Sequence, residues 1–190
     1  MTDNLDRQRL TEGFVCLALF TLTIPAANWL IGHIGTVCPP PHGPCLVPVA
    51  PGVMAPSGVL MIGLALVLRD LVQRRLGAKV SLFAIAAGAI LSAWLAPPAL
   101  VLASAVAFLL SEMADFAVYT PLQRRGLVLA VALSSLAGLV VDSIAFLWLA
   151  FGTLKYLPGQ IVGKAWMVLF ALPVVRWLRD RDARLGLTPA

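Results

Sequence analysis

Four ionisable residues stand inside long apolar stretches of this sequence: Glu112, Asp115, Asp142 and Lys164. A charged side chain at membrane depth is costly unless it is paired or hydrated, and such residues commonly mark ion pairs or ligand pathways. The chemistry that they indicate is therefore recognition by charge and hydrogen bonding inside a membrane.

Two of these residues form a carboxylate pair. Glu112 and Asp115 are three residues apart, so they share one face of a helix, and Tyr119 continues that face by another turn. The sequence shows no obvious partner for them, which favours binding of a cationic or hydrogen-bond-donating ligand. The alternative interpretation is that they hold helices together.

The other two residues lie at matching depths. At 1.5 Å per residue, Asp142 lies roughly 13 Å, and Lys164 roughly 10 Å, from the outer ends of their helices. We therefore expect an Asp142–Lys164 ion pair, either structural or functional. Gln160 is four residues before Lys164, on the same face.

Two weaker candidates complete the polar set. Asn28 lies almost one turn after Pro25, where proline frees a backbone carbonyl, and it lines a cavity or lies at the membrane interface. The adjacent Arg69 and Asp70 form either a salt bridge at a helix end or a gate, and Asp70 can join the carboxylates from below.

The composition explains why membrane helices must position these residues. The chain has 190 residues, 60% of them apolar and 12% charged, with mean hydropathy +0.92. Soluble domains are nearer half apolar and a quarter charged. This contrast excludes a soluble globular protein, a disordered chain and a nucleic-acid-binding protein.

Six apolar stretches predict an all-α integral membrane protein, a compact bundle of six transmembrane helices. The second reaches spanning length only if it extends from Val53 toward Leu76. None shows the two-residue alternation of a membrane barrel. The stretches are residues 14–32, 57–68, 80–96, 98–119, 127–151 and 157–177.

The basic residues predict the orientation. In a six-helix arrangement, twelve of the 14 Lys and Arg residues lie on one side, and only Lys155 lies on the other. Cytoplasmic segments are enriched in these residues, which places both termini in the cytoplasm. We expect one domain, residues 1–190, with cytoplasmic tails 1–12 and 179–190 and an outer loop 33–56.

The outer loop contains Cys38 and Cys45, on the oxidising side in this orientation. A disulfide is the leading interpretation. The alternatives are free thiols or a metal site with His42 and His33, although the cysteine spacing is not standard for zinc. The apolar segment 46–55 is expected to form a lid or a re-entrant segment.

Taken together, the polar motifs of this sequence resemble those of the VUT family of bacterial queuosine-precursor transporters. The resemblance covers nearly the whole chain. It rests on Ala27-Asn28-Trp29-Leu30, Ala55-Pro56-Ser57-Gly58, Leu68-Arg69-Asp70-Leu71-Val72, Gly77, Ser111-Glu112-Met113-Ala114-Asp115, Val118-Tyr119-Thr120-Pro121-Leu122, Gly138-Leu139-Val140-Val141-Asp142-Ser143, Gly159-Gln160 and Lys164.

The resemblance implies uptake of the 7-deazaguanine bases preQ0 and preQ1 across the bacterial inner membrane. It implies Glu112 or Asp115 as acceptor for the N1–H and 2-amino groups, much as acidic side chains accept from base amino groups elsewhere. Asn28 or Gln160 would then meet the O6/N7 edge. The remaining roles are stacking for Tyr119 or Phe116, and alternating access for the Asp142–Lys164 pair.

The main alternative function is a substrate-binding S-component of an energy-coupling-factor vitamin importer. The small residues of the first helix, Ala18, Ala26 and Ala27, lack the four-residue repeat suited to docking on a scaffold subunit. The chain has no P-loop and no zincin motif, so we expect no enzyme activity, cofactor or resident metal. The oligomeric state is left open between a monomer and a homodimer.

Overall fold

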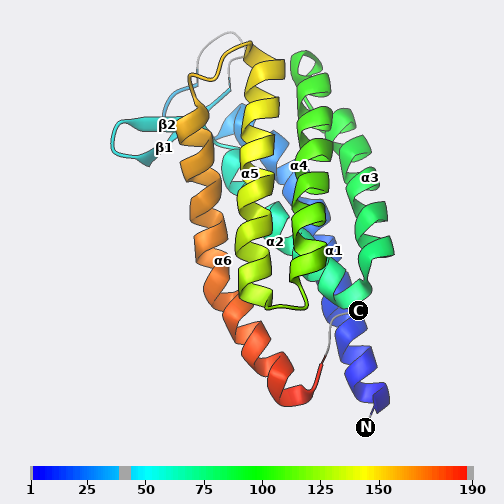
Figure 1. Cartoon of the computed structure of the whole chain (residues 1–190). Coiled ribbons are helices and arrows are strands. Elements are labelled where there is room, and N and C mark those ends of the chain that lie inside the picture. Colours follow the sequence, from blue (N-terminus) through cyan, green and yellow to red (C-terminus); the bar gives the residue numbers. More distant parts are fainter. Residues whose placement is uncertain (1, 39–43, 188–190) are drawn as a thin grey trace.

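The structure is a computed structural model that describes residues 2–38 and 44–187. Within these residues it contains six long helices that run alongside one another, with the start of α1 and the end of α6 at the same end (Figure 1). They are α1 (Thr2–His33), α2 (Val59–Leu76), α3 (Ala78–Leu95), α4 (Val101–Leu122), α5 (Leu127–Phe151) and α6 (Leu157–Leu185). A short 3-10 helix, Pro98–Leu100, precedes α4.

Five of these helices are long and apolar enough to cross a membrane: α1, α3, α4, α5 and α6. The predicted all-helical membrane fold is confirmed to this extent. α2 differs because it carries Arg69, Asp70, Arg74 and Arg75 within its 18 residues. It packs against each of the other five helices, so its charged side chains face protein rather than the surroundings of the bundle.

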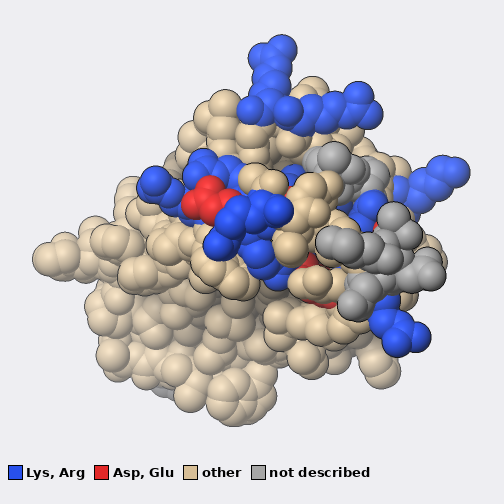
Figure 2. Space-filling model, turned by 90° about the horizontal axis from the view of Figure 1, so that it is seen from below, with Lys and Arg blue, Asp and Glu red and all other residues tan. Residues whose placement is uncertain are grey.

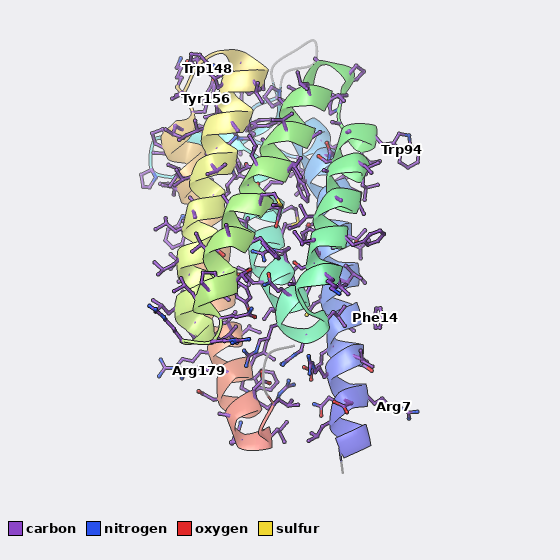
Figure 3. All side chains as sticks on the ribbon, turned by 45° about the vertical axis from the view of Figure 1, so that its right-hand side comes forward. Arg7, Phe14, Trp94, Trp148, Tyr156 and Arg179 are labelled. Carbon is purple, nitrogen blue, oxygen red and sulfur yellow. A yellow bond between two sulfur atoms is a disulfide. The ribbon has the colours of Figure 1, made fainter. Side chains whose placement is uncertain are left out.

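The outer surface of the bundle is apolar. Phe83, Ile90 and Trp94 on α3 and Phe170 on α6 are strongly exposed, and the Trp94 and Phe14 side chains point away from the helices (Figure 3). Helices that are hydrophobic on their outer face suit lipid surroundings, because hydrocarbon takes the place of water there. The polar side chains of the membrane segments are gathered inside.

The basic residues identify the two ends of the bundle. We call the end where α1 begins and α6 ends the basic end, since Lys and Arg side chains gather on it (Figure 2). Arg7 and Arg179 both lie there (Figure 3). The stretches that were expected to be tails continue as helix, to Thr2 and to Leu185.

The outer segment forms a β-hairpin at the opposite end. β1 (Leu46–Ala50) pairs antiparallel with β2 (Val53–Pro56), and Gly52 takes the positive φ of +72° that the turn between them needs. Trp166 Nε1 of α6 donates to the Val49 carbonyl at 2.9 Å. The segment that was expected to form a lid or a re-entrant segment is therefore a hairpin, because its backbone groups pair with each other. The Trp166 hydrogen bond holds this hairpin against α6.

Cys38 and Cys45 are joined by a disulfide beside this hairpin. Their sulfur atoms are therefore not available as thiolate ligands. His33 stacks on Trp29 with ring centroids 5.1 Å apart, and the fourth residue of the metal alternative, His42, lies outside the described residues.

Glycine residues allow close approach between α2 and α6 and between α4 and α5. A Cβ on Gly63 of α2 would lie 2.4 Å from the backbone oxygen of Lys164 on α6, and a Cβ on Gly138 of α5 would lie 3.1 Å from Cβ of Asp115 on α4. Close backbone approach of this kind is typical of helix contacts in membranes. It sets the distances between the ionisable residues on these helices.

Candidate functional site

A cavity lies among the helices in the half of the bundle away from the basic end. Its empty volume, with the open mouth included, is about 510 Å³, and all six helices and the end of β2 contribute to its wall. Most of the lining is apolar. Its polar and aromatic lining residues are Asn28, Ser92, Ser104, Phe108, Asp142, Phe146 and Gln160.

One wall of the cavity is built around the buried ammonium group of Lys164. Lys164 Nζ donates to Asp142 Oδ2 at 2.5 Å, Ser143 Oγ at 2.8 Å and Gln160 Oε1 at 2.5 Å. An ammonium group has three donors, so all are used. The carbonyl oxygen of Gln160 is engaged, which leaves its amide NH2 as the group able to donate to a ligand.

This geometry contains the ion pair that the helix depths predicted. Lys164 is 1% exposed and the Asp142 side chain 8% exposed, so the pair is buried but its carboxylate reaches the cavity wall. The two charges cancel. The pair can therefore present a carboxylate oxygen to a ligand without adding net charge to the membrane interior.

A second cluster surrounds the guanidinium group of Arg69. Arg69 is fully buried and forms ion pairs with Asp70 at 2.6 Å, with Glu112 at 3.3 Å and with Asp115. Its Nη1 also donates to Gln73 Oε1 at 2.8 Å. We call these five residues the Arg69 cluster.

Aromatic rings and a hydroxyl complete the surroundings of the Arg69 cluster. The guanidinium carbon lies 5.8 Å from the ring centre of Phe116 and 5.5 Å from that of Tyr119, within range of cation–π attraction. Ser134 Oγ of α5 donates to Asp70 Oδ2 at 2.6 Å. The cluster thus joins α2, α4 and α5.

The structure divides the residues that the sequence singled out into two groups. Three of them, Asn28, Asp142 and Gln160, line the cavity. The other group comprises the residues of α4 that face Arg69, namely Glu112, Asp115, Phe116 and Tyr119.

The expectation that the two α4 carboxylates lack a partner is wrong. Arg69 pairs with both, and Arg69 and Asp70 are themselves buried inside the bundle rather than placed at a helix end. The reason is that α2 lies among the other helices and carries its charges to the centre. A sequence alone does not reveal which helix occupies that place.

Several contributing residues were missed by the sequence reasoning. They are Ser92, Ser104, Phe108 and Phe146 in the cavity wall, and Gln73, Thr120 and Ser134 around the Arg69 cluster. Gln73 carried a usable signal, since it lies one turn after Arg69 on a helix face that also bears charge.

Residues 92–178, from the end of α3 into the second half of α6, match the model of the family described as "Putative vitamin uptake transporter". This match makes the segment similar to the VUT family, and it covers a little less than half of the 190-residue chain. Searches of curated proteins and of solved structures gave no significant match. Together with the five apolar helices, the similarity to a transporter family supports a multi-pass membrane protein.

The matched segment contains some of the residues of the cavity and some of the residues of the Arg69 cluster. It includes the α4 carboxylates and Asp142, Gln160 and Lys164, whereas Asn28 and Arg69 lie before it. The matched segment therefore supplies two carboxylates of the Arg69 cluster and the Asp142–Lys164 pair, whereas α1 and α2 supply Asn28, Arg69 and Asp70.

A third charged group lies at the basic end of the protein. Asp182 of α6 accepts from Arg74 at 2.9 Å and from Arg75 at 2.8 Å. Glu12 of α1 accepts from Arg75 at 2.9 Å and from Arg181 at 2.7 Å. We call these five residues the basic-end network; it ties α1, α2 and α6 together on the side away from the cavity.

Replacement of Asp182 is expected to loosen the basic end. Asp182→Ala leaves the buried guanidinium groups of Arg74 and Arg75 without their shared acceptor, and breaking a buried ion pair typically costs about 3–5 kcal/mol. We expect a clear fall in the melting temperature of the purified protein. The matched control is Asp180→Ala, since Asp180 is exposed and, among the residues that the structure describes, forms an ion pair only with its exposed neighbour Arg179. Equal melting temperatures for the two variants would contradict a stabilising role of the network.

Proposed function

We propose that this protein is a VUT-family transporter that imports 7-deazaguanine bases, the queuosine precursors preQ0 and preQ1, and binds the base in the cavity. The supporting observation is that one cavity is lined by a carboxylate, two amides and two phenyl rings. These belong to Asp142, to Asn28 and Gln160, and to Phe108 and Phe146. A flat base with hydrogen-bonding edges requires this combination. The resemblance of the polar motifs to queuosine-precursor transporters supports the choice of base.

The proposed recognition follows from the groups left free in the cavity wall. A guanine-like base has two donors, N1–H and the 2-amino group, which a carboxylate accepts. Lys164 holds Asp142 through Oδ2, so Oδ1 can accept from the base. Asn28 Nδ2 donates one hydrogen to the Ile24 carbonyl at 3.0 Å and keeps a second. This second N–H and the amide NH2 of Gln160 would donate to the O6/N7 edge, and the phenyl rings of Phe108 and Phe146 would stack on the base.

Glu112 and Asp115 take an indirect part in this proposal. Arg69 engages both, and neither lines the cavity. Glu112 lies one helical turn beyond Phe108 on α4, so it is a member of the Arg69 cluster that lies next to the cavity wall. Their charge would act on the base through the cluster rather than by direct contact.

The proposal places the basic end in the cytoplasm of a bacterial cell, with α2 as a sixth membrane crossing. Lys and Arg gather at that end (Figure 2), as is typical of cytoplasmic segments. The cavity then lies in the outer half of the membrane. A base would enter it from outside while the basic-end network keeps the cytoplasmic side closed.

The test is uptake of labelled preQ0 and preQ1 by bacteria that lack queuosine synthesis and their own importer and express this chain alone. We expect queuosine to appear in tRNA. Asn28→Ala and Gln160→Ala each remove a hydrogen bond worth about 1 kcal/mol, so each is expected to reduce uptake at low precursor concentration about fivefold.

The matched control is Gln123→Ala, which removes the same kind of side chain near the basic end of α4, outside the cavity. It is expected to leave uptake unchanged. Failure of the wild-type protein to import either base, although it is present in the membrane, would overturn the proposal. Rescue by an added ATPase and scaffold subunit would instead favour the S-component alternative.

A further inference from the structure

The Arg69 cluster holds more negative than positive charge. Three carboxylates, those of Asp70, Glu112 and Asp115, pair with one guanidinium group, and none is more than 2% exposed. Within residues 2–38 and 44–187, no other cation forms an ion pair with them. Fully ionised, the cluster would carry two uncompensated negative charges inside the bundle.

The neighbouring charged groups do not correct this imbalance. On α5 and α6, Asp142 and Lys164 neutralise each other. On α2, Arg74 is engaged by Asp182 in the basic-end network. Tyr119 of α4 contributes a neutral hydroxyl. The surplus charge therefore belongs to the Arg69 cluster itself.

A buried carboxylate without a compensating cation is far more costly than its neutral form, so such a group binds a proton instead. We infer that the Arg69 cluster binds protons, up to two at once, and is the site where proton movement is coupled to transport. The coupling part of this inference rests on the proposed function; the proton site itself does not.

Buried polar atoms of the cluster that lack a hydrogen-bond partner also support proton binding. Asp115 Oδ1 and the Tyr119 hydroxyl are buried and have no hydrogen-bond partner within the described part of the chain. The Tyr119 ring lies against the guanidinium group, so its hydroxyl belongs to this cluster. Added protons would supply hydrogen-bond donors where carboxylate oxygens now lack them.

A metal cation fits the cluster less well than protons. The guanidinium group already occupies the space between the three carboxylates. In the part of the chain that the structure describes, no group of three or more His, Cys, Asp or Glu side chains could hold a metal ion. A proton needs no such coordination shell.

α2 connects the proton site to the basic-end network. It carries Arg69 in the cluster and, one and a half turns later, Arg74 and Arg75 in the basic-end network. A movement of α2 that separates Arg74 and Arg75 from Asp182 would also shift Arg69 against Glu112 and Asp115. Opening of the cytoplasmic side and release of protons would then accompany each other.

Infrared spectroscopy of the purified protein in lipid tests the proton site without any substrate. We expect a carbonyl-stretch band of protonated carboxylic acid at neutral pH. At least one of Asp70→Asn, Glu112→Gln and Asp115→Asn should remove about half of it or more. The control Asp180→Asn alters an exposed carboxylate and should leave the band unchanged. A wild-type protein without this band at neutral pH would overturn the inference.

Vesicles containing the protein test the coupling. The probe is labelled preQ0, which carries no charge. For an inward gradient of about one pH unit, one-to-one coupling predicts about tenfold accumulation, and Glu112→Gln should abolish accumulation above the equilibrium level. Exchange of preQ0 without any effect of the gradient would overturn the coupling. If the band were present but wild-type vesicles exchanged no preQ0, the proposed function would fail and the proton site would stand.

Discussion

Replacement of Arg69 by methionine is expected to have the largest effect of any single substitution in this protein. Methionine fills a similar volume but leaves three buried carboxylates without their shared cation. Breaking a buried ion pair typically costs about 3–5 kcal/mol, and even with two protons bound the cluster keeps one charged carboxylate that depends on this side chain. We expect little folded protein in the membrane, and a strongly lowered melting temperature for whatever can be purified.

Two further variants separate charge from packing in this experiment. Arg69→Lys keeps the positive charge but loses the planar fork of donors that reaches several acceptors, so its stability should lie between those of Arg69→Met and the wild type. Adding Asp115→Asn to Arg69→Met removes one of the stranded carboxylates and should recover part of the lost stability. A melting temperature of Arg69→Met close to that of the wild type would show that the cluster does not hold the bundle together.

Lys164→Met is expected to have the second-largest effect, on both stability and transport. The substitution strands the Asp142 carboxylate and removes three hydrogen bonds, to Asp142, Ser143 and Gln160. About 3 kcal/mol or more of stability should be lost, which thermal unfolding of the purified protein would measure. Uptake of preQ0 should fall to background, because Asp142 and Gln160 lose the group that orients them at the cavity wall.

The double variant Lys164→Met with Asp142→Asn distinguishes a structural from a functional pair. It removes both charges together, so most of the stability lost in Lys164→Met should return. Uptake should stay at background, because the carboxylate that accepts from the base is gone. If the double variant and both single variants transported as well as the wild type, the pair would be structural only.

The extents of most helices follow from the sequence because they depend on local properties. Apolar runs of about twenty residues form helices in lipid whatever surrounds them, since the backbone must satisfy its own hydrogen bonds there. The stretches predicted as 127–151 and 157–177 correspond to α5 and α6, with α6 continuing to Leu185. The Asp142–Lys164 contact was also predictable, because depth along two adjacent helices is itself a local quantity.

The place of α2 and everything that depends on it required the tertiary structure. Residue types alone indicated charges at the end of an apolar helix, whereas packing puts Arg69 between α4 carboxylates 43 and 46 residues later in the chain. The division of the polar residues between a cavity and a separate charged cluster arises in the same way, and so do the ion pairs of Asp182 with Arg74 and Arg75. Contacts between distant residues depend on which helices become neighbours, and the hydropathy of each helix does not encode that choice.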